Sequence, residues 1–126
     1  MRNTLLSFAL GLTLLTGSWT AAVADVVCAS VAHGPSVGKA FTVHGRLSAW
    51  NGAPTHRIWI VGTKRMLGVH AGTPMPDNLK PFTQSFDVQV IGDFVVCPVT
   101  TSRPGVMQMV GIVSASHLQP QARAME

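Results

Sequence analysis

Two arginines and two tryptophans have the types and spacing that best suit molecular recognition in this chain. Arg46 and Trp50 are four positions apart in a segment that alternates apolar and polar residues, so both belong to its polar face. Arg57 and Trp59 are two positions apart and share a face of the following segment. Trp and Arg dominate binding hot spots, and a guanidinium can stack on an indole ring. We predict a basic aromatic binding surface here, with the alternative that the stack only covers a sheet.

Five histidines suggest a second hypothesis, a metal or hydrolytic site. None of them are paired at the i, i+2 or i, i+4 spacing, so only the fold could bring them together. His44 and His56 are the best pair, because they can face each other across a hairpin. Zinc or copper binding is therefore the alternative function, while solvated strand or turn positions are the expected placement. The five are His33, His44, His56, His70 and His117.

Two further patterns are expected to be structural. Met107 and Met109 form a Met-x-Met pair that would suit Cu(I), but flexible methionines pack well, and core packing is favoured. Residues 34–38 match Gly-x-Ser-x-Gly, which in hydrolases needs a strand, a sharp turn and a helix. No helical periodicity follows, so we predict a turn. The sequence therefore indicates no catalytic residue, no bound metal and no cofactor, and favours a binding module over an enzyme.

The elements that must position these residues are short strands. Residues 41–50 alternate cleanly, Asn51-Gly52 breaks the pattern, and β-rich segments return from residue 55 and from residue 66. Turn signals recur every 8–12 residues, as in all-β domains. We predict a small β-sandwich of six or seven strands, of the transthyretin or immunoglobulin type, with a small β-barrel as the alternative.

The remaining strands are predicted from the same patterns. Residues 25–31 suit a short edge strand, residues 82–91 alternate, and Gly92-Asp93 suits a turn into a strand at 94–99. Residues 106–115 are apolar on both faces, which is typical of a central strand. The polar residues after Leu118 suggest a frayed end. We expect one β domain over residues 25–118 and a flexible tail over 119–126.

The first 24 residues have the three parts of a secretory signal peptide. Arg2 supplies the basic start, residues 5–15 the apolar core, and Ala22-Val23-Ala24 a small-residue cleavage site. The apolar core is shorter than the roughly 20 residues of a membrane-spanning helix. We therefore expect a signal-peptide helix and a secreted or periplasmic protein, with no membrane span after cleavage.

The charge of the chain narrows the classes of partner that the sequence suggests. Nine basic and five acidic residues give a net charge of +4, without a dense run of cations, so nucleic acid is not expected. An envelope protein, a peptide or a glycan is the expected kind of partner.

Cys28 and Cys97 are the two cysteines, and an even count in an exported chain predicts one disulfide bond.

A longer pattern resembles known families. Gly45-Arg46-Leu47, an Asn-Gly-x-Pro turn and Gly92-Asp93-Phe94 resemble transthyretin-like β-sandwich domains. The fuller string, which adds Arg57-Ile58-Trp59 and Cys97-Pro98, resembles a group of small exported bacterial proteins without an assigned function. The resemblance covers about residues 41–118. It implies an exported β domain and implies no activity.

Overall fold

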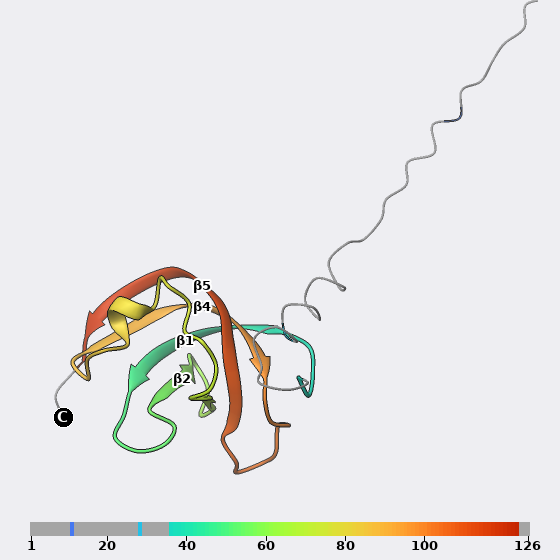
Figure 1. The fold of residues 1–126 in the computed structure, drawn as a ribbon, viewed down its shortest axis with the longest axis horizontal. Coiled ribbons are helices and arrows are strands. Elements are labelled where there is room, and N and C mark those ends of the chain that lie inside the picture. The colour runs from blue at the N-terminus through green and yellow to red at the C-terminus, as the bar shows by residue number, and fades with distance from the viewer. Residues whose placement is uncertain (1–10, 12–27, 29–35, 124–126) are drawn as a thin grey trace, which may run out of the picture.

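The computed structural model describes residues 11, 28 and 36–123. These residues form five strands and one short 3-10 helix (Figure 1). The elements are β1 (Phe41–Ala49), β2 (His56–Ile60), β3 (Met66–Val69), η1 (Lys80–Phe82), β4 (Val88–Pro98) and β5 (Gln108–Ala122). The expected all-β class is therefore confirmed, although the described part has five strands where six or seven were predicted.

The five strands close into one mixed barrel in the order β1-β2-β3-β5-β4. β1 pairs with β2 on one side and with β4 on the other, both antiparallel. β3 and β5 are parallel neighbours and complete the ring. This strand order corresponds to the small barrel that the sequence left as the alternative to a sandwich. The edge strand predicted at residues 25–31 lies outside the described residues, apart from Cys28.

Strand alternation fills the interior with aliphatic side chains. The inward positions of β1 and β2 carry Val43, Leu47 and Ile58, and Phe94 on β4 is fully buried among them. The long connection from β3 to β4 closes the core, because Leu79 just before η1 is also completely buried. Outward positions on β1 and β2 therefore remain for Arg46, Arg57 and Trp59.

β4 corrects one sequence prediction. It runs without a break through Gly92-Asp93, where a turn between two strands was predicted. The irregularity there is a register shift against β5, a β-bulge between Ile91 and Asp93. A Cβ at Gly92 would lie 2.7 Å from Leu118 Cδ2 and 2.9 Å from the carbonyl oxygen of Ser116. The glycine thus serves the close approach of β5.

β5 corrects a second prediction. It extends to Ala122, and its end pairs with the start of β4, so residues 119–122 are not a frayed tail. Figure 1 shows β4 and β5 as long curved strands that run side by side. The polar composition after Leu118 reflects a solvent-facing strand. Conversely, residues 82–87, predicted as strand, form the end of η1 and a loop.

A disulfide bond joins Cys28 to Cys97, as predicted from the cysteine count. The two Cα atoms are 5.4 Å apart, and both side chains are buried. Such a bond is compatible with an oxidising environment outside the cytoplasm. The predicted signal-peptide helix lies outside the described residues. Within the described part, no helix is long and apolar enough to cross a membrane.

Candidate binding surface

The β1–β2 hairpin brings the predicted residues together on the outside of the barrel. Arg46 pairs with Trp59 in the strand register, and Ser48 pairs with Arg57. The Arg46 guanidinium carbon lies 4.8 Å from the centre of the Trp59 ring, which is a cation–π distance. The register that folding requires therefore also places Arg46 on its aromatic partner.

Trp50 is contacted by two guanidinium groups. The Arg57 guanidinium carbon is 5.5 Å from the centre of its ring, and that of Arg123 is 4.4 Å away. Arg123 follows β5 directly, in the region that the sequence assigned to a tail, and was therefore missed. A signal for it would have been a longer β5, which the polar residues after Leu118 concealed. We call Arg46, Trp50, Arg57, Trp59 and Arg123 the basic aromatic face.

Hydrogen bonds hold the two indole rings in place. Trp50 Nε1 donates to Ser48 Oγ at 3.1 Å, and Trp59 Nε1 donates to the Thr63 carbonyl oxygen at 2.7 Å. Both side chains are half-buried, so neither tryptophan belongs to the core. Burial of both rings in the core would have excluded a binding surface, and neither ring is buried there. The binding hypothesis also predicts at least one largely exposed tryptophan, and this prediction is wrong, because both rings are half-buried.

Two of the arginines are also tied to the backbone. Arg57 Nε donates to the Pro54 carbonyl oxygen at 3.1 Å, and Arg123 donates to the carbonyl oxygen of Ala49. Each of these bonds uses one edge of a guanidinium, which carries five N–H donors in total. Donors therefore remain on both arginines while the position of each group is restrained.

No arginine of this face forms an ion pair with a carboxylate of the described residues. In the described part of the chain, the ion pairs join Asp77 with Lys80 and Asp93 with two histidines, and none includes an arginine. An external anion that approaches these guanidinium groups would therefore have no such ion pair to displace, although Arg46 Nε itself is buried.

A pocket lies between the β2–β3 turn and the β4–β5 loop. It is an open depression of about 630 Å³. Its charged lining comes from Lys64 and Arg65 in the turn and from Arg103 in the loop. Its apolar lining includes Met66, Val106 and Met107. We call this the loop pocket. Of the basic residues that the structure describes, only Lys39 and Lys80 belong to neither the basic aromatic face nor the loop pocket.

A buried polar side chain connects the walls of the loop pocket. Gln108 is only 7% exposed, and its Oε1 accepts a hydrogen bond from Arg65 Nη2. Its Nε2 donates to the Thr100 carbonyl oxygen at 3.0 Å. Gln108 thus links an arginine of the turn to the backbone of the opposite loop.

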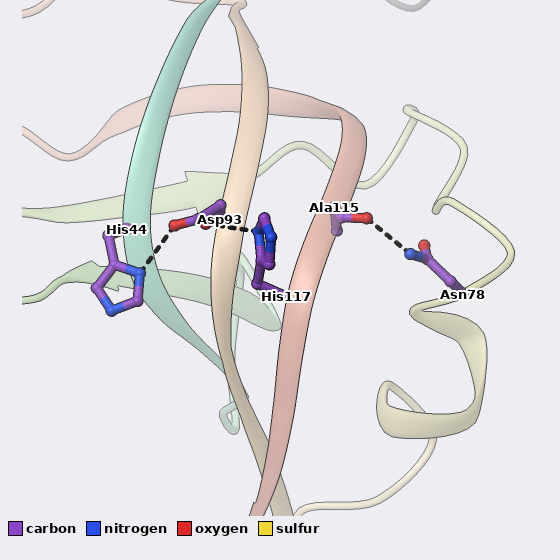
Figure 2. A network of polar contacts seen from close by, with 5 residues as sticks. All are labelled: His44, Asn78, Asp93, Ala115 and His117. Carbon is purple, nitrogen blue, oxygen red and sulfur yellow. Dashed lines mark hydrogen bonds and ion pairs between the residues drawn. The ribbon is translucent and has the colours of Figure 1, made fainter.

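Two histidines converge on one carboxylate at a different place on the barrel (Figure 2). His44 Nδ1 of β1 donates to Asp93 Oδ1 at 2.9 Å, and His117 Nδ1 of β5 donates to Asp93 Oδ2 at 3.0 Å. The hydrogen bond from His44 is the largest cause that holds the pKa of Asp93 below its usual value, with a smaller contribution from His117. The group joins three adjacent strands on the solvent side.

This arrangement differs from the histidine site that the sequence suggested. His44 meets His117 through Asp93, while His56 Nε2 instead contacts the Thr83 carbonyl oxygen at 3.0 Å. Within residues 36–123, no three His, Cys, Asp or Glu side chains are grouped to hold a metal ion. The loop pocket is lined by other residues and includes no histidine. None of the described histidines therefore lines the loop pocket, and His33 lies outside the described residues.

The remaining sequence candidates have structural contacts. The sulfur atoms of Met107 and Met109 lie over Gly68, where a Cβ would be 2.9 and 2.7 Å from them, so the pair covers the outside of β3 and does not enter the core. Ser36 Oγ donates to the Gly38 carbonyl oxygen at 2.7 Å, within its own turn. β1 begins three residues later, so the strand–turn–helix context of a nucleophile elbow is not met.

Comparison with protein-family models, with curated proteins and with solved structures gives no match.

Proposed function

We propose that this protein is an exported binding module that holds an acidic polysaccharide on its basic aromatic face. The observation that carries the proposal is the stacking of Arg46 on Trp59 and of Arg57 and Arg123 on Trp50. These contacts gather three cations on one outward surface of β1, β2 and the end of β5. Secretion rests on the signal-peptide pattern and is compatible with the disulfide bond.

An anion is the ligand that this surface suits. A planar guanidinium matches a carboxylate or sulfate by two parallel hydrogen bonds. Stacking and backbone bonds already restrict the three arginines, so less side-chain entropy is lost on binding. The absence of arginine ion pairs within the described residues means that no such pair must break first.

The state of the tryptophans favours a glycan over single-stranded nucleic acid. Nucleic-acid grooves need open aromatic rings on which bases stack. Here each ring is half-buried and carries a guanidinium, so the surface presents charged edges.

The barrel supports a binding role in a general way. Its strand order, with β1 between β2 and β4 and β3 parallel to β5, is that of OB-type barrels. Such barrels bind oligosaccharides and oligonucleotides at strands 2–3 and at the β1–β2 and β4–β5 loops. Trp59 lies on β2 and Trp50 begins the β1–β2 loop, so the basic aromatic face overlaps that region. The topology alone does not establish function.

The test compares two double variants of equal charge change by calorimetric titration with dextran sulfate and neutral dextran. Arg57→Gln with Arg123→Gln removes two cations from the face. Lys39→Gln with Lys80→Gln removes two cations elsewhere and is the control. We expect the first pair to lower the affinity for dextran sulfate at least tenfold and the control pair less than threefold, with no binding of neutral dextran.

Equal losses in the two double variants would show unspecific charge attraction and contradict the proposal. A single-stranded oligonucleotide that binds more tightly than dextran sulfate, with the same dependence on Arg57 and Arg123, would reject the glycan assignment.

A further inference from the structure

We propose that the loop pocket is a separate subsite, which holds one terminal unit of the acidic polysaccharide. This inference rests on the proposed function and adds where the chain ends on the protein. Three cations from two different loops, Lys64, Arg65 and Arg103, face one depression of about 630 Å³. That volume is within the range of small-ligand sites. No carboxylate lines it.

The lining points to a sugar-sized acid with an apolar side. Val106, which is 63% exposed, supplies an apolar side chain to the wall of the depression. Met66 and Met107 adjoin it, and methionine side chains adapt to irregular ligands. A saccharide unit has this combination, because its C–H groups can pack on such a wall while sulfate or carboxylate groups meet the cations.

The pocket also has a restrained cation. Arg65 donates to the buried Gln108, which is anchored to the Thr100 backbone. Thr100 Oγ1 in turn accepts from the Met109 backbone N–H at 2.9 Å. This chain of bonds runs from the β2–β3 turn through β5 into the β4–β5 loop. Gln108, which also lines the depression, therefore restrains the position of Arg65 through this hydrogen bond.

The loop pocket and the basic aromatic face are connected. Trp59 Nε1 donates to the carbonyl oxygen of Thr63, the residue directly before Lys64. The ring that supports Arg46 thus also braces the turn that supplies two cations to the pocket. At about 3.3 Å per residue, the five residues of β2 span roughly 16 Å. An acidic chain lying along β2 would reach from Arg57 to the pocket with several sugar units.

The test uses a probe that is too small to cover both places. Sucrose octasulfate, a disaccharide-sized polyanion, is titrated into the mature protein and into three variants by calorimetry, next to dextran sulfate. The pocket variant is Arg65→Gln with Arg103→Gln, the face variant is Arg57→Gln with Arg123→Gln, and the charge control is Lys39→Gln with Lys80→Gln. Circular dichroism confirms that each variant is folded.

We expect the pocket variant to weaken octasulfate binding at least tenfold and by more than the face variant does, and the control variant to weaken it less than threefold. Dextran sulfate should lose affinity in both the pocket and the face variants. Gln108→Met keeps the charge unchanged but frees Arg65, and should weaken octasulfate binding about threefold.

The two proposals fail in different ways. If octasulfate binding is the same in the pocket variant as in the control, the subsite is wrong, whatever dextran sulfate does. If the face variant binds dextran sulfate as tightly as wild type while the pocket variant loses affinity, the proposed role of the basic aromatic face is wrong. The pocket then remains as the binding site. If octasulfate does not bind the wild-type protein at all, the subsite is also rejected.

Discussion

At the scale of single residues, the proposed binding rests on guanidinium groups stacked on indole rings. Each stack contributes about 0.5–1 kcal/mol at an exposed site, which is modest for stability. Its larger effect is orientation, because Arg57 reaches Trp50 from β2, Arg123 reaches it from the end of β5, and each is held by a backbone carbonyl. Arginine orientation, more than net charge, therefore distinguishes this face from an ordinary basic surface.

Asp93 leads to a pH prediction at the same scale. Hydrogen bonds from His44 and His117 lower its pKa in the folded protein, so the ionised carboxylate favours the native state. A lowered folded pKa gives stability that is present above the unfolded value near 3.9 and is lost as the pH falls through the folded value. Asp93→Asn should therefore be less stable than wild type at pH 6, and the difference should shrink below about pH 4.

Urea unfolding between pH 2 and pH 7 checks this expectation. Asp87→Asn is the matched control, because Asp87 is exposed and this substitution removes the same negative charge. A difference between wild type and Asp93→Asn that stays constant down to pH 2 would show that the carboxylate is not stabilised by its two histidines.

β5 is the element that decides most of the architecture. It pairs with β4 along nearly its whole length and with β3 in parallel, so it closes the barrel. Its last residues also deliver Arg123, whose backbone N–H donates to the Asp87 carbonyl oxygen at 2.8 Å. The end of β5 thus serves both the barrel and the basic aromatic face.

Truncation of the C-terminus tests whether residues 119–122 act as part of a strand or as a tail. A chain that ends after Leu118 loses the pairing of residues 119–122 with residues 88–91, and it should be destabilised by about 2 kcal/mol or more. A chain that ends after Arg123 keeps this pairing and is the control, with an expected change within about 0.5 kcal/mol. Urea denaturation measures both. Equal stability of the two chains would mean that the end of β5 contributes nothing to the fold.

The covalent link from Cys28 to Cys97 acts on the molecule as a whole. It spans 69 residues, from the chain before β1 to the end of β4. In the chain-entropy account, closing a loop of this length stabilises the folded state by about 4 kcal/mol. For a domain of this size, that is a large share of a net stability of roughly 5–15 kcal/mol.

Removing the bond should therefore lower stability strongly. Cys28→Ala with Cys97→Ala should lose about 4 kcal/mol in chemical denaturation, and reduced wild type should behave alike. Added reductant should change the wild type but leave the double variant unaffected, which is the control. If reductant does not change the unfolding midpoint of the wild-type protein, this role of the disulfide bond is contradicted.

Local sequence patterns determine several features of this protein without reference to tertiary contacts. The alternation at residues 41–49, the Asn51-Gly52 break and the β-rich returns correctly predicted β1, β2 and β3. Two cysteines correctly predicted one disulfide bond. These features depend on neighbours in sequence or on a simple count. The strand period and turn chemistry therefore suffice for them.

Only the tertiary structure decided the closure of the barrel, the continuity of β4 through Gly92, and the composition of the two candidate sites. Glycine followed by aspartate suits a turn or a bulge equally well, and the choice depended on the approach of β5. Arg123 joined the basic aromatic face, and Arg103 joined Arg65 at the loop pocket, through contacts between residues far apart in the chain. Cations that look dispersed in sequence become neighbours because barrel closure places loops and strand ends side by side.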